Sequence, residues 1–507
     1  MSAVRLERRS SAWVFVVALA GLGVLAGCSA SDSPHEEPHG SDGGTRPGDG
    51  GTQDAGTGSN DGGTQDGGTQ PTDGGTQSPD AGSPSFTWGQ GTDTGTLAGD
   101  VWTPGRDGTG LVNQVSWAIV PKGRWVEVSG TPITQLEAEL KAAIPGYRDL
   151  GSQGLSGVIN AFSGIALDVP NARWWAFGGG HNDSSNNGLY RFDMSSMRWS
   201  IEKLPDNPAN WPSDAYGNTL SVYLPAADYI RKNPDSDVYP DEFFDADRPA
   251  ASTRNPVARH TYNGLVYNPD LNEVAFGVRR MWRYSLDTRT WKRHNPFDTP
   301  GSKYDGATGY GGAAGWTFWD EVKRQYLFGP TENYNYSQWW SFDIDDQTWK
   351  WEVITPPAWA FAQMVKVKRK LVSFPLPGGA DRHTFPPQLI AYNLDTTQWE
   401  FYPLDHGLEL ARCFKGDFEG QIMAYVAPLN RYIAAFRYDK DGDGTFEYRT
   451  YVIDATASTL REAPEYEVGA FGGWHDLVKN RFFYLATHDA LVLVRKGEEN
   501  LRVFKLP

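Results

Sequence analysis

Two short stretches of the chain bring together residue types that could transfer protons or bind ions. His181 and Asp183 follow three consecutive glycines, and Arg259, His260 and Tyr262 fall within four residues. Histidine titrates near neutral pH, so it can act as a general base or ligate a metal. Because residues two apart on a strand point the same way, we expect His260 and Tyr262 to act together, with Arg259 recognising an anion.

Aromatic strands repeat along the chain around these stretches. An aromatic strand, a polar turn and a tryptophan recur in residues 190–199, 282–291, 340–349 and 390–399. Two more strand-like runs precede each copy, and two further units without the tryptophan follow. Four strands per unit and six units predict a β-propeller. Residues 117–128 could add a strand that closes the ring or belong to a seventh blade, so we expect six blades, with seven as the alternative.

A glycine pair after the second strand and the Tyr…Trp spacing of the third and fourth strands resemble kelch repeats. The resemblance covers residues 158–507 and is degenerate in the last two units. It implies an all-β, kelch-like propeller of the galactose-oxidase type, and it implies no particular activity, because function lies in sites rather than in folds. Galactose oxidase needs a copper site with a tyrosine crosslinked to a cysteine. The domain has only Cys413 and no matching tyrosine motif, so we expect no copper.

In a propeller, the loops that enter the inner strands share one face with the loops that join second to third strands. Five of the nine histidines fall on this predicted face. The insert of residues 205–256 would arch over it, and long loops of this kind are usually functional or disordered. The alternative is that each histidine only bonds neighbouring backbone. The residues expected to bind a ligand there are His181, Asp183, Asn333, Arg382, His383, Arg412 and His475, with His488 and Asp489 contributed by the sixth unit.

These residues leave three classes of function open. The first is a binding module for a glycan or a protein partner. The second is a carbohydrate-active enzyme, a polysaccharide lyase or glycoside hydrolase, in which His260, Tyr262 and Arg259 would abstract a sugar C5 proton. The third is a purely structural envelope protein. We take binding as the first hypothesis, because the enzymatic hypothesis rests on residue types only.

The stretch of residues 439–447 begins with carboxylates at every second position, which are followed by a glycine turn. Calcium prefers about six to eight oxygen ligands, and the stretch resembles short calcium loops between strands of extracellular propellers. Thr450 stands where an EF-hand has its last glutamate, so the site is not a full EF-hand. The alternative is a polar hairpin turn, since Asp-Gly is itself a turn signal. The expected ligands of a structural calcium ion are Asp439, Asp441, Asp443, Thr445 and Glu447.

The start of the chain predicts export and attachment to a membrane. Basic residues precede an apolar run, residues 12–26, that is too short for a transmembrane span. The sequence Leu-Ala-Gly-Cys at residues 25–28 resembles the bacterial lipobox, which implies a signal peptide over residues 1–28 and a lipid on Cys28. Ser29 favours the outer membrane, by resemblance to Gram-negative lipoproteins. We therefore expect a lipoprotein of the cell envelope.

The segment after Cys28 has a different composition from the rest of the chain. Residues 29–85 repeat Asp-Gly-Gly-Thr-Gln units and have too little apolar surface to fold, which predicts a disordered linker. Residues 86–157 would then be an N-terminal extension that packs on the propeller of residues 158–507. The formal net charge of −16 argues against nucleic acid, which requires clustered Lys and Arg. It suits a self-repelling monomer with a glycan or protein ligand.

Overall fold

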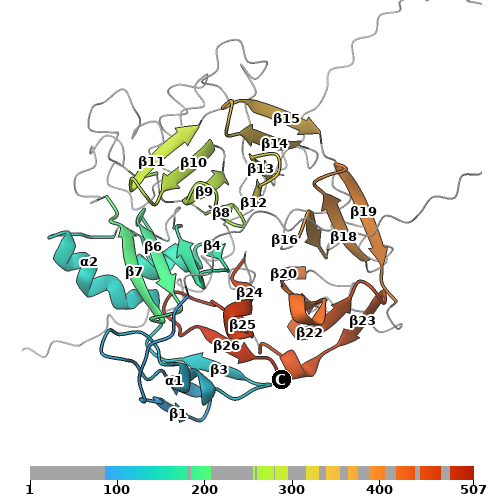
Figure 1. Ribbon diagram of the computed structural model, residues 1–507. Helices are drawn as coiled ribbons and strands as arrows, with labels where there is room; N and C mark the ends of the chain where they lie inside the picture. Colours follow the sequence, from blue (N-terminus) through green and yellow to red (C-terminus); the bar gives the residue numbers. More distant parts are fainter. Residues whose placement is uncertain are drawn as a thin grey trace, which may run out of the picture. The chain divides into compact units, whose positions relative to one another are not determined.

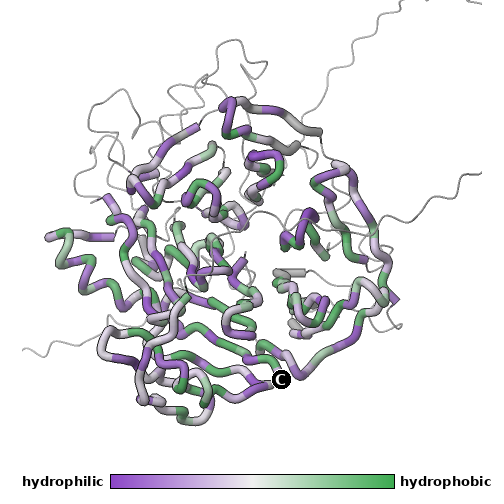
Figure 2. Tube along the Cα trace, viewed as in Figure 1, coloured by the Kyte–Doolittle hydropathy of each residue, from purple (hydrophilic) through white to green (hydrophobic). Residues whose placement is uncertain are grey.

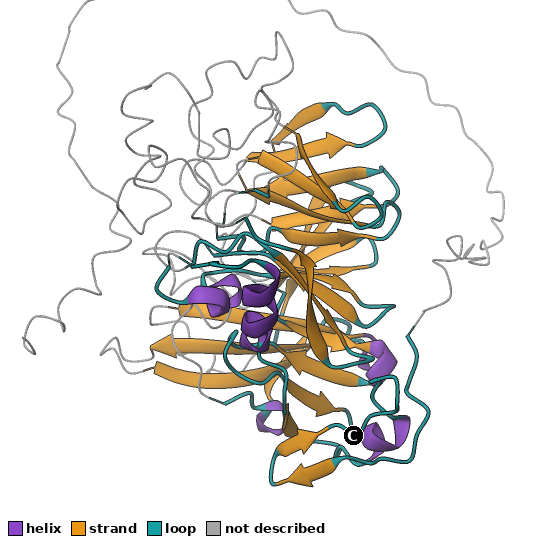
Figure 3. Cartoon of the chain, turned by 90° about the vertical axis from the view of Figure 1, so that its left-hand side faces the viewer, coloured by secondary structure: helices purple, strands orange, loops and turns teal. Residues whose placement is uncertain are grey.

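Strands are the main regular structure in the described part of the chain, and the helices there are short (Figure 3). The chain divides into two compact units, residues 1–75 and 76–507, and every described residue belongs to the second. In this computed structural model the described residues are 86–149, 151–179, 184–206, 255–256, 258, 260–278, 280–294, 316–329, 338–353, 364–374, 388–405, 418–439, 446–469 and 480–507.

Five four-stranded antiparallel sheets follow one another along the chain, each with its strands side by side in sequence order. They are blades 1 to 5 of a β-propeller, and the first strand of each lies innermost (Figure 1). Blade 1 contains β4 (Ile165–Asp168), β5 (Arg173–Ala176), β6 (Leu189–Asp193) and β7 (Arg198–Lys203). Blade 2 contains β8 (Leu265–Asn268), β9 (Glu273–Val278), β10 (Arg280–Ser285) and β11 (Thr290–His294).

The next three blades repeat this arrangement. Blade 3 contains β12 (Trp316–Asp320), β13 (Gln325–Gly329), β14 (Gln338–Asp343) and β15 (Trp349–Val353). Blade 4 contains β16 (Met364–Val367), β17 (Lys370–Ser373), β18 (Gln388–Asn393) and β19 (Gln398–Pro403). Blade 5 contains β20 (Phe418–Val426), β21 (Arg431–Asp439), β22 (Phe446–Asp454) and β23 (Thr459–Glu462). The longest strands of the described chain are therefore in blade 5.

The sixth blade combines the two ends of the described chain. From the inside outwards it contains β24 (Phe482–Leu485), β25 (Ala490–Leu493), β26 (Arg502–Lys505) and β3 (Trp125–Val128). Two further strands, β2 (Val101–Thr103) and β1 (Thr96–Ala98), extend the sheet beyond β3. The predicted all-β propeller is confirmed with six blades, and the stretch of residues 117–128 supplies the closing strand rather than a seventh blade.

The sixth blade corrects the strand order expected from sequence. The sequence pattern predicts four consecutive strands within residues 469–506, with the last as the outermost. In the structure β24 packs beside β20 of blade 5 as the innermost described strand, and β26 is third because β3 takes the outer position. Residues 470–479, which include most of the strand expected first, lie outside the described residues.

The helices of the described residues are short segments between strands. The N-terminal part contains α1 (Gln114–Ala118), η1 (Ile133–Leu136), α2 (Glu137–Ala143), η2 (Gly154–Ser156) and α3 (Gly157–Asn160). Blades 5 and 6 carry the single-turn 3₁₀ helices η6 (Ala427–Leu429), η7 (Pro464–Tyr466) and η9 (Ala486–His488). None of these segments replaces a strand of a blade.

The aromatic repeat of the sequence forms the outer hairpin of each of the first four blades. Residues seven apart become direct cross-strand partners, as in Tyr284 with Trp291 and Tyr392 with Trp399. Their rings lie 5.1 Å and 5.2 Å apart, and aromatic cross-strand pairs of this kind stabilise a hairpin. The same register joins Phe192 to Trp199 and Phe342 to Trp349.

The blades pack on one another through large apolar side chains. Trp175 of blade 1 stacks on Tyr267 of blade 2, with ring centroids 4.9 Å apart, and Trp174 contacts Phe483 of blade 6 at 5.3 Å. Hydrophobic and hydrophilic stretches alternate along the blades (Figure 2), as expected for strands whose two faces have different neighbours. The core therefore lies between blades, and the ring axis remains lined by the inner strands.

Candidate functional site

Most residues predicted to bind or act lie outside the described residues, and their roles remain predictions. Asp439 and Glu447 lie within β21 and β22, where Asp439 pairs with Phe446 and Glu447 with Tyr438. The two described ends of the predicted calcium stretch thus lie on paired strands of blade 5, and residues 440–445 lie outside the described residues. The residues outside the described part are Cys28, His181, Asp183, Arg259, Asn333, Arg382, His383, Arg412, His475, Asp441, Asp443 and Thr445.

His260 and Tyr262 are brought together, although not on a strand. The His260 Nδ1 atom lies 3.0 Å from the Tyr262 hydroxyl oxygen, and both side chains are buried. The two residues precede β8, and Tyr262 has a left-handed backbone with φ of 47°. The expectation of a shared strand is therefore wrong, because a turn rather than the two-residue period of a strand makes the contact.

The left-handed turn at Tyr262 belongs to the repeat. Phe162, which stands at the corresponding position before β4, has φ of 50°, and its carbonyl accepts a hydrogen bond from the Tyr262 amide at 2.7 Å. The rings of Phe162 and His260 lie 4.5 Å apart. Thr261 donates to the Phe177 carbonyl of blade 1 at 3.1 Å. The His260–Tyr262 contact therefore also has a structural role at the joint between blades 1 and 2.

A buried polar segment lies just before β6 of blade 1. Ser184 to Asn187 are almost wholly inaccessible. The Asp149 carboxylate accepts hydrogen bonds from the Ser184 and Ser185 hydroxyls at 2.8 Å and 3.1 Å. Burial, together with the Asp149 carboxylate, raises the pKa of Tyr147. A run of four polar residues before an aromatic strand was the available signal for this buried network.

The two ends of the long insert meet at the same segment. Asp206 Oδ2 accepts hydrogen bonds from the Asn187 side chain at 3.0 Å and from the Asn255 amide at 3.1 Å. The Asn255 side chain donates to the Leu204 carbonyl at 2.7 Å. The insert therefore leaves and rejoins the propeller at one point of blade 1, while residues 207–254 lie outside the described residues.

His488 is not on the face expected from sequence. It lies in the turn between the first and second strands of blade 6, at the opposite end of the blade from the loops that enter inner strands. Its ring is buried among Phe86, Trp88 and Trp117, with centroids 4.6, 4.7 and 5.0 Å away. Burial lowers its pKa to about 3. His488 thus anchors the N-terminal segment to blade 6, and the neighbouring Asp489 shares its turn.

A cavity of about 990 Å³ opens at the end of the ring that carries the six first-to-second-strand turns, which we call the turn face. All six blades contribute to its lining. The next-to-last residue of each inner strand lines the cavity, one residue per blade. Together they form the mouth ring, which consists of Leu167, Tyr267, Trp319, Lys366, Tyr425 and Tyr484.

Hydrogen bonds fix three tyrosines of the mouth ring. The hydroxyls of Tyr267, Tyr425 and Tyr484 donate to a side-chain oxygen five residues downstream, at distances of 3.2, 2.8 and 2.9 Å. Each acceptor has a left-handed backbone, which closes the turn. This arrangement holds the tyrosines before any ligand arrives, which lowers the cost of binding. The acceptors are Asn272, Asn430 and Asp489.

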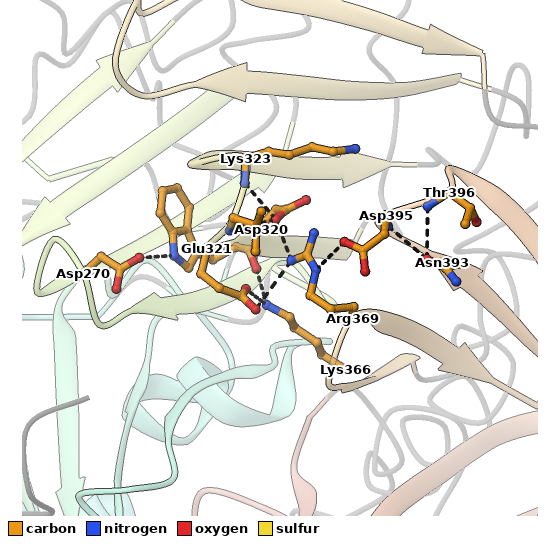
Figure 4. A network of polar contacts seen from close by, with 11 residues as sticks. Asp270, Asp320, Glu321, Lys323, Lys366, Arg369, Asn393, Asp395 and Thr396 are labelled. Carbon is orange, nitrogen blue, oxygen red and sulfur yellow. Dashed lines mark hydrogen bonds and ion pairs between the residues drawn. The ribbon is translucent and has the colours of Figure 1, made fainter. Parts of the chain in front are cut away.

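Charged groups concentrate on the side of the mouth formed by blades 2, 3 and 4 (Figure 4). Trp319 donates its indole N–H to Asp270 at 2.9 Å, and Lys366 donates to the Trp319 carbonyl at 2.6 Å. Lys366 also forms an ion pair with Glu321. These contacts join three blades around the mouth, so its charged side is fixed by the packing of the ring.

Arg369 links this charged side to the outer hairpin of blade 4. Its guanidinium donates to Asp320 at 2.7 Å and to Asp395 at 2.8 Å. Asp320 is fully buried, and its carboxylate also accepts hydrogen bonds from the Val322 and Lys323 amides at 3.1 Å. Burial would raise the pKa of Asp320, but these hydrogen bonds outweigh it and lower the pKa. Asp320 is therefore a charged structural group.

The fold and the cavity define the class of protein as a six-bladed β-propeller with an axial cavity able to hold a small ligand. No family model and no curated protein sequence matches the chain. Within the described ranges, no group of three or more histidine, cysteine or acidic residues is placed to hold a metal ion. A search of those same ranges finds no helix long and apolar enough to cross a membrane. The kelch and lipobox resemblances remain predictions.

Proposed function

We propose that the protein is a lipid-anchored binding protein of the bacterial cell envelope that takes a glycan at the axial cavity. The cavity carries this proposal, since its volume of about 990 Å³ lies at the upper end of the range for small-molecule pockets, about 300–1,000 Å³. A protein partner would instead bury a broad surface, about 800 Å² on each side. The concave mouth therefore favours a short glycan over the protein partner.

The chemistry of the lining also suits a glycan. Apolar side chains such as Phe318 and Met364 form much of the wall, and carboxylate, ammonium and amide groups stand at the mouth. A few fixed polar groups on an apolar wall are typical of sites that orient small ligands. Hydroxyl groups of a sugar can both donate to carboxylates such as Asp270 and accept from Lys366. The proposed site thus lies on the turn face, opposite the face where His181 and His383 had been expected to bind.

A glycan array probed with the purified full-length chain tests the proposal. Ala427 is exposed at the mouth, and Ala427→Trp should block it and abolish array binding. Ala457 is exposed in the β22–β23 turn of the same blade, so Ala457→Trp is the matched control and should bind normally. Equal binding by both variants, or no bound glycan at all, would refute a glycan site in the cavity.

The lipid anchor is tested separately. Cys28→Ala should move the protein from the membrane fraction to the soluble fraction and stop incorporation of a labelled fatty acid. An unchanged membrane fraction in this variant would contradict the proposed anchor. The outer membrane is the proposed location, and separation of inner and outer membranes by density tests it.

The contact between His260 and Tyr262 supports a second candidate, a polysaccharide lyase. The 3.0 Å separation of Nδ1 and hydroxyl oxygen is within the reach that proton transfer requires, and Arg259 would bind the uronate carboxylate. Lyase activity appears as ultraviolet absorbance of the unsaturated product released from a polyuronate. Tyr262→Phe should abolish it, while Tyr466→Phe in blade 5 should not. Absence of the product with wild-type protein and a panel of polyuronates would exclude this candidate.

A further inference from the structure

We infer that the glycan bound at the turn face carries free amino groups, and that Asp270 receives an ammonium group of the sugar. This inference rests on the proposed function. It is drawn from the distribution of charge around the mouth, where one carboxylate forms no ion pair among the described residues while its neighbours do. Arg324 acts on that carboxylate only through a longer-range attraction. The ligand would supply a positive charge in direct contact.

The acidic groups of the lining differ in their partners. Asp168 is buried and pairs with Arg173 at 2.7 Å. Glu321 pairs with Lys366 and lies 3.5 Å from Arg369. Asp270 is exposed at the mouth and accepts the neutral Trp319 indole N–H, and no lysine, arginine or histidine of the described residues forms an ion pair with it.

The position of Asp270 suits a ligand group rather than a structural one. Pro269 and Asp270 form the start of the blade 2 turn, and both line the cavity. The Trp319 indole fixes one carboxylate oxygen at 2.9 Å, so the other can accept hydrogen bonds from an incoming donor. A hydrogen bond to a charged group is stronger than one between neutral groups. An acetamido N–H could also donate to this carboxylate, but only an ammonium would bring the opposite charge and form an ion pair with it.

The remaining charges of the mouth support a cationic sugar rather than an anionic one. The lining contains Asp168, Asp270 and Glu321 against a single cation, Lys366. Lys366 is held by Glu321 and by the Trp319 carbonyl, so binding an anion there would require breaking an existing ion pair. The whole chain has a formal net charge of −16, which would attract a cationic ligand over longer distances.

A pair of trisaccharides that differ only in acetylation tests the inference. Glucosamine trisaccharide carries free amino groups, and its N-acetylated counterpart has the same backbone without charge. Titration calorimetry with the full-length chain at low ionic strength should give about tenfold tighter binding of the free amine, as expected for one hydrogen-bonded charge. The difference should shrink with added salt, because exposed charges are screened.

Variants distinguish the effect of the Asp270 charge from the effect of its hydrogen bond to Trp319. Asp270→Asn keeps an oxygen for the Trp319 indole and removes the charge, so it should reduce the preference to within about twofold. Glu321→Gln should give an intermediate loss. Glu139→Gln changes an exposed acid on α2 and should keep the full preference. Melting curves of all three variants establish that each is folded.

The outcomes distinguish the inference from the proposed function. Equal affinities for the two trisaccharides, or a preference that survives Asp270→Asn in folded protein, would overturn the inference and leave a neutral-glycan site standing. Failure of both trisaccharides to bind while the array reports another glycan would also overturn it. Absence of any glycan ligand would instead remove the proposed function on which it rests.

Discussion

Removal of the Arg369 guanidinium should destabilise the propeller far more than removal of an exposed arginine. Arg369→Met leaves the Asp320 carboxylate, which is 0% exposed, without the guanidinium that lies 2.7 Å from it. Breaking a buried ion pair by deleting one partner costs about 3–5 kcal/mol, because a charge is left uncompensated. The lost contact with Asp395, which is 57% exposed, adds at most about 1 kcal/mol.

The pH dependence of this loss has a definite sign. In the wild type the pKa of Asp320 lies below its ordinary value of 3.8, so its ionised form stabilises the fold above that pH, and this contribution disappears as the pH falls through the folded-state pKa. Without Arg369, burial should raise the pKa of Asp320 instead. The deficit of Arg369→Met should therefore be largest at neutral pH and shrink in mild acid, as Asp320 becomes protonated.

Urea unfolding of wild type and variants at neutral and mildly acidic pH measures both effects. Arg324→Met is the matched control, since Arg324 pairs with Asp345 at 2.8 Å but the side chains are 42% and 60% exposed, and it should cost about 1 kcal/mol or less. Adding Asp320→Asn to Arg369→Met should restore part of the loss. Equal costs for the two arginine variants, or no recovery in the double variant, would refute the reasoning.

Three further predictions concern other parts of the chain. Tyr262→Phe removes the hydroxyl that contacts His260 and should lower the free energy of unfolding by about 1 kcal/mol; an unchanged urea midpoint would show that this contact is not stabilising. Burial lowers the pKa of His488 from 6.5 to about 3. The free energy of unfolding should therefore decrease as the pH is lowered from 6.5 towards 3, because the unfolded chain takes up a proton that the folded chain does not. His488→Phe should flatten that part of a melting-temperature profile, and an unchanged slope would contradict the assignment. Calcium should raise the melting temperature, and Asp441→Ala should abolish the increase; absence of a calcium effect in the wild type would exclude the predicted site.

The hairpins could be predicted because their determinants are close together in sequence. Tyr392 and Trp399 are joined by a short polar turn, and their spacing of seven residues alone sets the cross-strand register. Repetition of the same spacing then identifies four of the six blades. The register within one hairpin depends on residues close together in the chain, so a single sequence suffices to find it.

The sixth blade could not be counted in the same way. Its outer strand, β3, precedes blade 1 in the chain, and Arg502 donates to Glu127 across 375 residues. The prediction of four consecutive strands in residues 469–506 therefore placed β24, β25 and β26 one position too far out in the blade. This shift moved His488 to the wrong face, whereas its aromatic neighbours Phe86 and Trp88 show where it packs.

The cavity was missed because its lining comes from six separate parts of the chain. Each inner strand contributes its next-to-last residue, and only the closed ring places these residues together. A local signal was nevertheless present, since the tyrosines at 267, 425 and 484 are each followed five residues later by asparagine or aspartate. The His260–Tyr262 pair was found from its spacing, although a turn rather than a strand produces the contact.

Closure of the ring by β3 determines when the fold can be completed during synthesis. Blades 1 to 5 are each built from consecutive strands, so each can form soon after its own residues emerge from the ribosome. The β3 strand is made before all of them, but its partner β26 (Arg502–Lys505) is made after all of them. A nascent chain therefore carries an unpaired strand edge while blades 1 to 5 are synthesised, and pairings this distant in sequence form slowly. A chain that stops before residue 502 would hold five blades and an open sixth, so β26 closes the whole ring.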